Sequence, residues 1–400
     1  MSLKDVRSKF PIFKSNKKLV YLDTANSAQK PAAVIDALDD FYRNKYSNIG
    51  RGVYSLAGIA TDAYEKTRQT IKEFVNGTAG EIIFTKNATE SLNLVASCFA
   101  KFLKEGDEIL LTELEHHSNY VPWHFLRKKK VNIKFIPINK DGELELDKIN
   151  SLITNKTKII SLIHISNVTG ITSPLKKIIE IAKTKKIPVC IDGTQAVAHT
   201  TVNLKDLDCD FYAFSSHKMY GPAGVGLLYM KNQWLDKFDP FLGGGGMIEN
   251  VDTKNITYAT GVNKFEAGSM PSAEVVALKE AVHFIDHLKI KNIVSHEHSL
   301  TEYALDKIKK FNDIEFVGNP SEEASLFSFN IKGIHPHDVS TVFDQDHIAV
   351  RAGHHCCQVL HKKMNLISSI RVSFGIYNTK QDVDALCDSI KKCKKLFKLN

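Results

Sequence analysis

The sequence predicts an α/β protein with a large domain, built on a mostly parallel seven-stranded sheet, and a smaller C-terminal α/β domain. Three observations support this fold class. Helical and strand-like patterns alternate from about residue 60 onward, several apolar runs end in polar residues, and a glycine-rich section separates two such regions. Alternating strands and helices stack around parallel sheets, and ligands bind where the strands end.

The predicted strands are short apolar runs, with helical periodicity in the intervals between them. Strand candidates cover residues 81–85, 108–111, 133–138, 158–165, 187–192, 210–215 and 225–230. Helical patterns cover 89–103 and 175–184. The interval before 225–230 has no helical pattern, so an antiparallel orientation is open to this strand.

A run of glycines, Gly243–Gly246, opens a polar section that extends to about Asn263 and predicts a loop or hairpin. A long helix over 273–287 follows it. The second region then contains helical patterns within 290–311, at 338–344 and from Lys380, with a strand at 326–331. This succession predicts the smaller α/β domain.

The chain has 400 residues, of which 43% are hydrophobic and 24% are charged, a composition typical of globular proteins. The first residues carry charges without an apolar core, and no stretch approaches about 20 apolar residues, so we expect a cytoplasmic protein with no membrane segment. The net charge of +8 is spread along the chain. Its lysine clusters, 128–130 and 391–398, are typical of solvated helix faces, and we expect no nucleic-acid partner.

The seven cysteines do not suggest disulfides in a chain without an export signal. There is no CxxC pair, and the segment His354–Cys357 is too compact to enclose a structural zinc, so no metal site is predicted. Cys98, Cys190, Cys209 and Cys387 lie in patterns typical of a core.

Lys218 and Asp192 form the most informative pair in the chain. Asp192 ends the strand candidate 187–192, and Lys218 follows the strand candidate 210–215. Pyridoxal phosphate needs a lysine that holds its aldehyde as an imine and an acid that keeps its ring nitrogen protonated. Each residue alone is more often structural. Together, at the ends of parallel strands, they indicate this cofactor.

Three polar side chains are candidates for binding the cofactor phosphate. Thr89 lies where a strand ends and a helix begins, a position whose free amides bind anions. A simple helix cap explains Thr89 equally well. Ser215 and His217 flank Lys218 and could complete the phosphate site. His116, after another strand candidate, could stack on the ring, although a strand-end histidine is more often only structural.

A second cluster follows the strand candidate 347–350. Arg351, His354 and His355 precede Cys356, and cationic and histidine neighbours favour the nucleophilic thiolate. Cys357 is explained well as a buried core cysteine, and Cys356 much less so. Arg371 lies further along, and its planar guanidinium suits a substrate carboxylate.

With these motifs in place, the chain resembles the group II cysteine desulfurases (SufS type), within the class V aminotransferase family of fold-type I pyridoxal phosphate enzymes. The resemblance covers nearly the whole length and is highly specific. The matching stretches include 21–23, 29–31, 51–52, 60–65, 115–117, 166–168, 192–196, 217–222, 265–268, 351–356 and 377–379.

The resemblance implies a role for each matching residue. Lys218 would carry the cofactor, Asp192 would pair with the ring nitrogen, and Gln195 would bind the ring oxygen. The remaining implied contacts are stacking by His116, a position near ring and substrate for Asn167, phosphate binding by Thr89, Ser215, His217 and the amide of Ala88, and carboxylate binding by Arg371 with Arg351 nearby. Cys356 would accept the sulfur.

The resemblance also implies a fold-type I architecture, with a large domain over 17–272 and a small domain from 1–16 and 273–400. It implies a homodimer in which Ser269, in place of a family threonine, reaches the phosphate of the other subunit. The chain departs from the family pattern at Asn26, where a small alanine is usual, at Gly50, where a histidine is common, and at Cys357, where alanine is common.

The expected reaction converts L-cysteine to L-alanine and leaves the sulfur as a persulfide on Cys356. Lys218 or His116 would move the α-proton. A partner of the SufE or SufU kind would then take the sulfur for iron-sulfur cluster assembly. The loop that carries Cys356 is short and cannot swing far, which favours an acceptor that enters the site.

Three other functions share parts of this residue pattern. Selenocysteine lyase shares the expected fold and differs in its preferred substrate. A class V aminotransferase would produce a keto acid and leave Cys356 without a role. A catalytically silent docking protein predicts a lost lysine or aspartate, and both residues are present.

Overall fold

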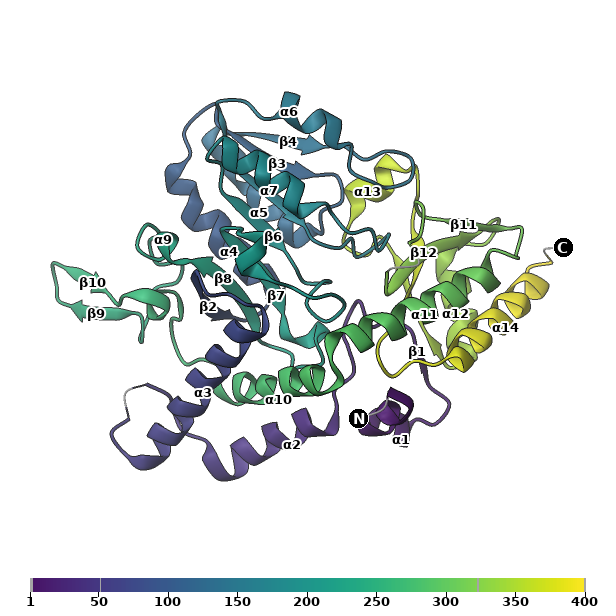
Figure 1. The fold of residues 1–400 in the computed structure, drawn as a ribbon, viewed down its shortest axis with the longest axis horizontal. Helices are drawn as coiled ribbons and strands as arrows, with labels where there is room; N and C mark the ends of the chain where they lie inside the picture. The colour runs from purple at the N-terminus through teal and green to yellow at the C-terminus, as the bar shows by residue number, and fades with distance from the viewer. Residues whose placement is uncertain (1–2, 51, 322–323, 399–400) are drawn as a thin grey trace.

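The computed structural model describes residues 3–50, 52–321 and 324–398 (Figure 1). Its main feature is a seven-stranded sheet in the order β2-β8-β7-β6-β5-β3-β4. The strands are β2 Gly80–Thr85, β3 Glu108–Thr112, β4 Asn132–Ile136, β5 Thr157–Ile163, β6 Val189–Asp192, β7 Phe211–Ser215 and β8 Gly226–Lys231. All seven correspond to predicted strands, which confirms the predicted sheet.

The sheet is parallel except at β8, which runs antiparallel to both β7 and β2. The link from β7 to β8 has no crossover helix, which leaves the antiparallel arrangement open to this strand. Every residue of β3, β6 and β7 is buried. Helices therefore cover both faces of the sheet, as expected for strands that are almost continuously apolar.

The helices around this sheet are mostly short. They are α4 Ala88–Phe99, α5 Val121–His124, α6 Ile149–Leu152, α7 Leu175–Thr184, α8 Leu204–Leu207 and α9 Asn232–Leu235. The predicted helix 175–184 matches α7, and the predicted 89–103 is divided into α4 and a 3-10 turn over Ala100–Phe102.

Two helices that the sequence did not predict, α2 Ala32–Asp40 and α3 Ser55–Phe74, pack against α10 Ser272–Leu288. The polar section after the glycine run forms the hairpin β9 Ile248–Val251 and β10 Ile256–Tyr258, which projects from the body of the protein (Figure 1). The prediction of a loop or hairpin is confirmed there.

The C-terminal region forms a four-stranded antiparallel sheet in the order β11-β12-β15-β14. Its strands are β11 Ile314–Phe316, β12 Leu326–Ile331, β14 Arg351–Gly353 and β15 Ser369–Ser373, and its helices are α11 Ile290–Ile308, α12 Pro336–Gln345, α13 Gln358–Lys363 and α14 Lys380–Leu396. The predictions for β12, α11, α12 and α14 are confirmed, whereas β11 and β15 were not predicted.

The N-terminal segment contacts both the C-terminal region and the large sheet. After the 3-10 turn Leu3–Lys9 and helix α1 Pro11–Ser15, strand β1 Val20–Tyr21 pairs in parallel with β13 Ile348–Ala349 of the C-terminal region. Leu22 then packs in the same hydrophobic cluster as Phe327 and Val372. Further along, the amide of Ala28 donates to the carbonyl of His217 after β7 (3.0 Å), so residues 22–28 connect the C-terminal sheet with the end of a large-sheet strand.

No helix in the described ranges combines the length and apolar character that a bilayer span requires.

Candidate active site

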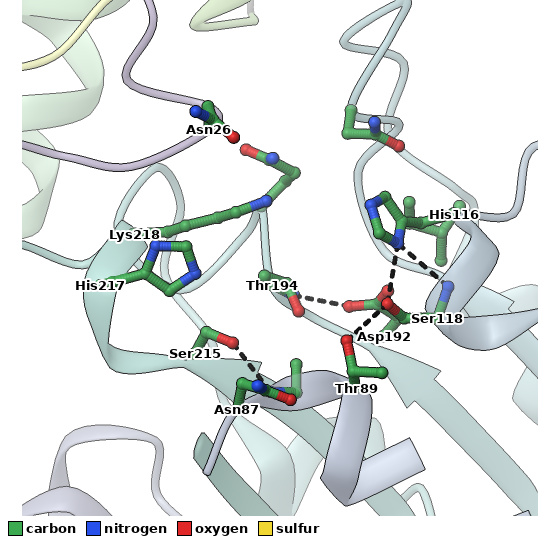
Figure 2. Close-up of a pocket in the computed structure, with 14 residues that line it drawn as sticks. Asn26, Asn87, Thr89, His116, Ser118, Asp192, Thr194, Ser215, His217 and Lys218 are labelled. Atoms are coloured by element: carbon green, nitrogen blue, oxygen red, sulfur yellow. Dashed lines mark hydrogen bonds between the residues drawn. The ribbon is translucent and has the colours of Figure 1, made fainter. Parts of the chain in front are cut away.

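A cavity of about 220 Å³ opens at the carboxyl ends of the parallel strands. Its lining contains nine of the ten residues predicted to bind the cofactor (Figure 2). They are Ala88, Thr89, His116, Asn167, Asp192, Gln195, Ser215, His217 and Lys218. The structure therefore brings together residues from five separate strand ends, those of β2, β3, β5, β6 and β7, as the parallel topology requires.

Lys218 and Asp192 enter the cavity from neighbouring strands. Asp192 is the last residue of β6, and Lys218 lies in the 3-10 turn directly after β7. Burial and the nearby Arg371 lower the pKa of Lys218 to about 8. Burial raises the pKa of Asp192, against the opposing effects of its hydrogen bond from the Thr194 amide and the charge of Lys218. A ligand in the cavity that pairs with either group would compensate the desolvation of that group.

The N-terminus of α4 forms one wall of the cavity with hydroxyl groups in front of it. The amide of Ala88 donates to Ser215 Oγ (2.8 Å), and the hydroxyls of Thr89 and Ser118 lie 2.7 Å apart. Because Ser215 Oγ accepts here, its own hydrogen remains available for an acceptor in the cavity. These groups and the helix N-terminus suit a phosphate.

His116 is held in one orientation by its neighbour Ser118. The Nδ1 atom accepts from the backbone amide of Ser118 (3.1 Å), so the neutral ring carries its proton on Nε2. Burial, followed by the charge of Lys218, lowers the pKa of His116 to about 3. The ring is therefore neutral at physiological pH and can present a flat face to an aromatic ligand.

Several buried polar atoms around the cavity have no hydrogen-bond partner among the described residues. They are Asn167 Oδ1, Thr194 Oγ1 and Gln195 Oε1, all on side chains that line the cavity. Buried polar groups in folded proteins are normally satisfied, so unpaired ones at a cavity indicate a polar ligand. The amine, acid and hydroxyl groups described above, together with these atoms, fit pyridoxal phosphate.

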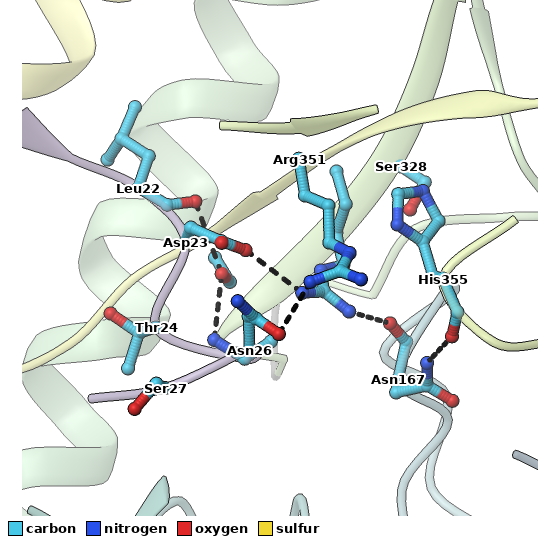
Figure 3. A network of polar contacts seen from close by, with 12 residues as sticks. Leu22, Asp23, Thr24, Asn26, Ser27, Asn167, Ser328, Arg351 and His355 are labelled. Atoms are coloured by element: carbon cyan, nitrogen blue, oxygen red, sulfur yellow. Dashed lines mark hydrogen bonds and ion pairs between the residues drawn. The ribbon is translucent and has the colours of Figure 1, made fainter. Parts of the chain in front are cut away.

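Arg371 lies in β15 of the C-terminal sheet and contacts Asn167, which lines the cavity. Its Nη2 pairs with Asp23 Oδ1 (3.0 Å), and its Nη1 donates to the backbone oxygen of Asn167 (3.0 Å) (Figure 3). Burial lowers its pKa, an effect that Asp23 opposes. Its Nε has no described partner. Arg371 thus offers a buried, rigidly held donor to an anion.

Cys356 lies in the short connection between β14 and α13. Its carbonyl accepts from the amide of His117 (2.7 Å), and Asn167 Nδ2 donates to the carbonyl of His355 (2.7 Å). Both His355 and Cys356 adopt positive φ angles, 51° and 56°. The loop is therefore fastened at two carbonyls, which agrees with the expectation that it is short and cannot swing far.

The two cysteines of this loop differ in environment. Cys356 is partly exposed, whereas Cys357 is fully buried with its Sγ 3.3 Å from the carbonyl oxygen of Leu114. A negative charge on the Cys356 thiolate would raise the pKa of both Lys218 and Arg371. Burial raises the pKa of Cys357 far above its usual value. Cys356 is therefore the accessible thiol of the pair.

Ser269 is the one predicted cofactor residue that the structure places elsewhere. It lines a separate cavity of about 610 Å³ beside α3 and the hairpin β9–β10, together with Gly268 and Tyr64. Within one chain it does not reach the Lys218 cavity, because the 265–269 segment lies against α3.

The sequence did not identify Asp23, Asn26, Thr194 and Ser118 as site residues. Asp23 anchors Arg371, Asn26 and Thr194 line the cavity, and Ser118 orients His116. Thr194 and Ser118 lie within two residues of predicted site residues in the sequence, and this closeness is a signal by which they could have been identified. The contacts of Asp23 and Asn26 join distant parts of the chain, so local spacing carried no signal for them.

The family model of class V aminotransferases (Aminotransferase class-V) matches residues 20–386. A protein of Staphylococcus epidermidis named as a probable cysteine desulfurase is 44% identical over 402 residues, covering 99% of this chain and 97% of the relative. A protein of the same printed name from Halalkalibacterium halodurans is 42% identical, with 99% of both proteins covered.

Solved structures agree with the sequence relatives. The cysteine desulfurase CsdA from Escherichia coli, in an S-sulfonic acid form, superposes with a TM-score of 0.92 at 34% identity, with 99% of each chain covered. An apo cysteine desulfurase from Thermococcus onnurineus has a TM-score of 0.92 at 33% identity, with 98% of each chain covered. The whole chain, and not one region of it, is therefore similar to these proteins.

Proposed function

The chain belongs to the class V aminotransferase family and, within it, to the cysteine desulfurases, and from this premise we propose how its own residues divide the reaction. Enzymes of this class depend on pyridoxal phosphate. The proposal rests on Asn167, which lines the Lys218 cavity and is bonded both to Arg371 and to the Cys356 loop. A cofactor lysine, a carboxylate-binding group and an accessible thiol then act on one small amino acid, L-cysteine.

The cofactor would be held by groups already oriented toward the cavity. Lys218 would carry it, Asp192 would pair with its ring nitrogen, and Gln195 would accept a hydrogen bond from the ring hydroxyl at its unpaired Oε1. The hydroxyls of Thr89 and Ser215 would bind the phosphate. When bound, pyridoxal phosphate supplies an electron sink that weakens the Cβ–Sγ bond of the substrate.

Arg371 would bind the substrate carboxylate. Its side chain is 3% exposed, and its position is set by Asp23 on one side and Asn167 on the other. The free Nε supplies a donor at a fixed position, which suits the planar geometry of a carboxylate.

Lys218 rather than His116 would move the α-proton. An amine with a pKa of about 8 is partly deprotonated near neutral pH and can accept a proton. The His116 ring, with a pKa of about 3, is a much weaker base. The role of His116 would be to hold the cofactor ring through its flat face.

Cys356 would then attack the substrate sulfur. A bond forms between Cys356 Sγ and the substrate Sγ while the Cβ–Sγ bond breaks. The electron pair of the broken bond stays with the carbon fragment, which takes up a proton and leaves as L-alanine. The transferred sulfur remains as a persulfide on Cys356.

The persulfide would pass to a separate acceptor protein. The Cys356 loop is fastened through the carbonyls of residues 355 and 356, so the acceptor must enter the site to reach the sulfur. An acceptor of the SufE or SufU kind, feeding iron-sulfur cluster assembly, agrees with this geometry and with the group II (SufS type) resemblance.

A homodimer would complete the site through Ser269. Large apolar side chains are exposed on two neighbouring features, Tyr54 and Ile59 on and beside α3, and Val251 and Tyr258 on the hairpin. Exposed apolar clusters of this kind mark interfaces. A second copy that covers them could bring Ser269 to the other subunit's phosphate. Sedimentation at micromolar concentration should give a dimer mass, and a fully active monomer would contradict this arrangement.

The residue roles are tested by three substitutions in the purified holoenzyme. Lys218→Ala should remove the absorbance of covalently held cofactor. Cys356→Ser should keep that absorbance and lose alanine production from L-cysteine. Cys357→Ser is the matched control, because its thiol is buried and points away from solvent. Activity retained by Cys356→Ser and lost by Cys357→Ser would overturn the nucleophile assignment.

A further inference from the structure

Asn26 is a polar side chain at a position that the family usually fills with a small alanine. It follows β1 in the segment between the two sheets, and it lines the cavity that contains Lys218. Its amide oxygen accepts from Arg351 Nη1 at 2.6 Å, a short bond across the two parts of the chain (Figure 3). A charge-assisted bond of this length holds a flexible side chain in one place.

Arg351 carries a charge that no acid compensates. It forms no ion pair with any residue in the described ranges, whereas Arg371 pairs with Asp23. Its bond to Asn26, which lines the cavity, places the Arg351 guanidinium close to the cavity, where its charge adds to burial in lowering the pKa of both Arg371 and His116. Arg351 and Arg371 are cross-strand partners in β14 and β15, and only Arg371 is paired with a carboxylate, so an excess positive charge remains where an anion would bind.

We propose that Asn26 is a positioning residue that holds Arg351 beside Arg371, so that the two guanidinium groups bind the substrate carboxylate together. This inference deepens the proposed function and rests on it. It assigns Asn26 a part in selecting substrates that carry a carboxylate. Arg351 touches the substrate, and Asn26 acts through Arg351.

The chemistry of the amide explains why this side chain suits the position. An alanine would leave the Arg351 side chain without an acceptor and free to sample several rotamers. An aspartate would accept the same bond, but its charge would cancel that of Arg351 and repel the substrate carboxylate. The asparagine oxygen accepts the bond without adding a charge, so the guanidinium is fixed and its attraction for an anion is kept.

The first experiment measures ligand binding to the holoenzyme without turnover. The cofactor absorbance is titrated with L-alanine, which carries a carboxylate, and with ethylamine, which lacks one. Asn26→Ala should raise the Kd for L-alanine about threefold to tenfold, the range expected for one lost hydrogen bond. The Kd for ethylamine should stay unchanged. Equal weakening of both ligands would indicate a general structural role and would overturn the proposal.

The second experiment asks whether Asn26 acts through Arg351. In the Arg351→Ala background, Asn26→Ala should cause no further weakening, because its partner is already gone. Additive losses would contradict the coupling. In steady-state assays Asn26→Ala should raise KM for L-cysteine with little change in kcat, since the lost interaction is made in the ground and transition states alike. Asn26→Asp should bind L-alanine more weakly than Asn26→Ala does, and tighter binding would refute the charge argument.

The two proposals fail in different ways. If the unmodified holoenzyme makes no alanine from L-cysteine, the proposed reaction is wrong whatever Asn26 does. If it makes alanine and Asn26→Ala leaves both the Kd for L-alanine and the KM unchanged, only the role of Asn26 is wrong.

Discussion

Replacing Glu266 by alanine should destabilise the protein more than any exposed charge substitution nearby. Glu266 is 8% exposed, and its carboxylate accepts from both Nη atoms of Arg68 at 2.7 and 3.0 Å. It also accepts from the amide of Phe84 (2.7 Å) and the hydroxyl of Tyr64 (3.0 Å). The substitution removes four bonds at once and leaves the Arg68 charge buried.

The expected loss follows from what remains after the substitution. Removing one partner of a buried pair costs about 3–5 kcal/mol when the other charge is left unpaired, and since Arg68 keeps only the half-exposed Glu65, we expect the lower end of this range. The matched control is Glu65→Ala, since Glu65 pairs with the same arginine but its side chain is 53% exposed. Exposed ion pairs contribute about 0–1 kcal/mol. The two variants should therefore differ by roughly 2 kcal/mol or more.

Urea unfolding of both variants, followed by circular dichroism, measures this difference as a shift in midpoint. Glu266→Gln should fall between Glu266→Ala and the unmodified protein, because the amide keeps one acceptor oxygen. Equal midpoints for Glu266→Ala and Glu65→Ala would contradict this expectation, since burial of the carboxylate would then not decide the loss of stability. A loss in Glu266→Ala below about 1 kcal/mol would refute it as well.

Three further outcomes are expected. Folding lowers the pKa of His116 from 6.5 to about 3, so between these pH values the unfolded state binds a proton that the folded state does not. The free energy of unfolding therefore decreases as pH falls from 6.5 toward 3. His116→Gln should lose less urea resistance between pH 7 and pH 5 than the unmodified protein does. In cofactor-free protein, the rate at which a reagent acylates Lys218, followed by mass spectrometry, should reach half its maximum near pH 8, a lower pH than for exposed lysines. A midpoint near pH 10.5 would contradict the lowering of the Lys218 pKa by burial. Cys357→Ala should cost about 1–2 kcal/mol through lost packing and its weak sulfur bonds, while peptide mapping still finds the persulfide on Cys356.

The strand-end residues of the site were predictable because they depend on short-range pattern. An apolar run that ends in a polar residue marks a strand whose carboxyl end opens on the crevice of a parallel sheet. Asp192 and Lys218 were found in this way, and the structure places both in one cavity. Thr89 was found by the same pattern, with the helix start beside it as a second signal.

The contacts that complete the site were not predictable from spacing. Arg371 meets Asp23, and Arg351 meets Asn26, through the packing of the antiparallel sheet against the N-terminal segment. Periodicity describes which face of an element is buried, but it does not say which distant element covers that face. The position of Ser269 shows the same limit, because its expected partner lies on another copy of the chain.

The fold class, the cofactor and the reaction class follow from the amino-acid sequence, because they depend on residue types at strand ends and on motifs that match along the whole chain. Three contacts became known only from the folded arrangement: Asn167 fastens the Cys356 loop, Asp23 orients Arg371, and Asn26 holds Arg351. Each of these bonds joins separate elements. Their energy depends on distances of a few ångströms that are set by how the two sheets pack.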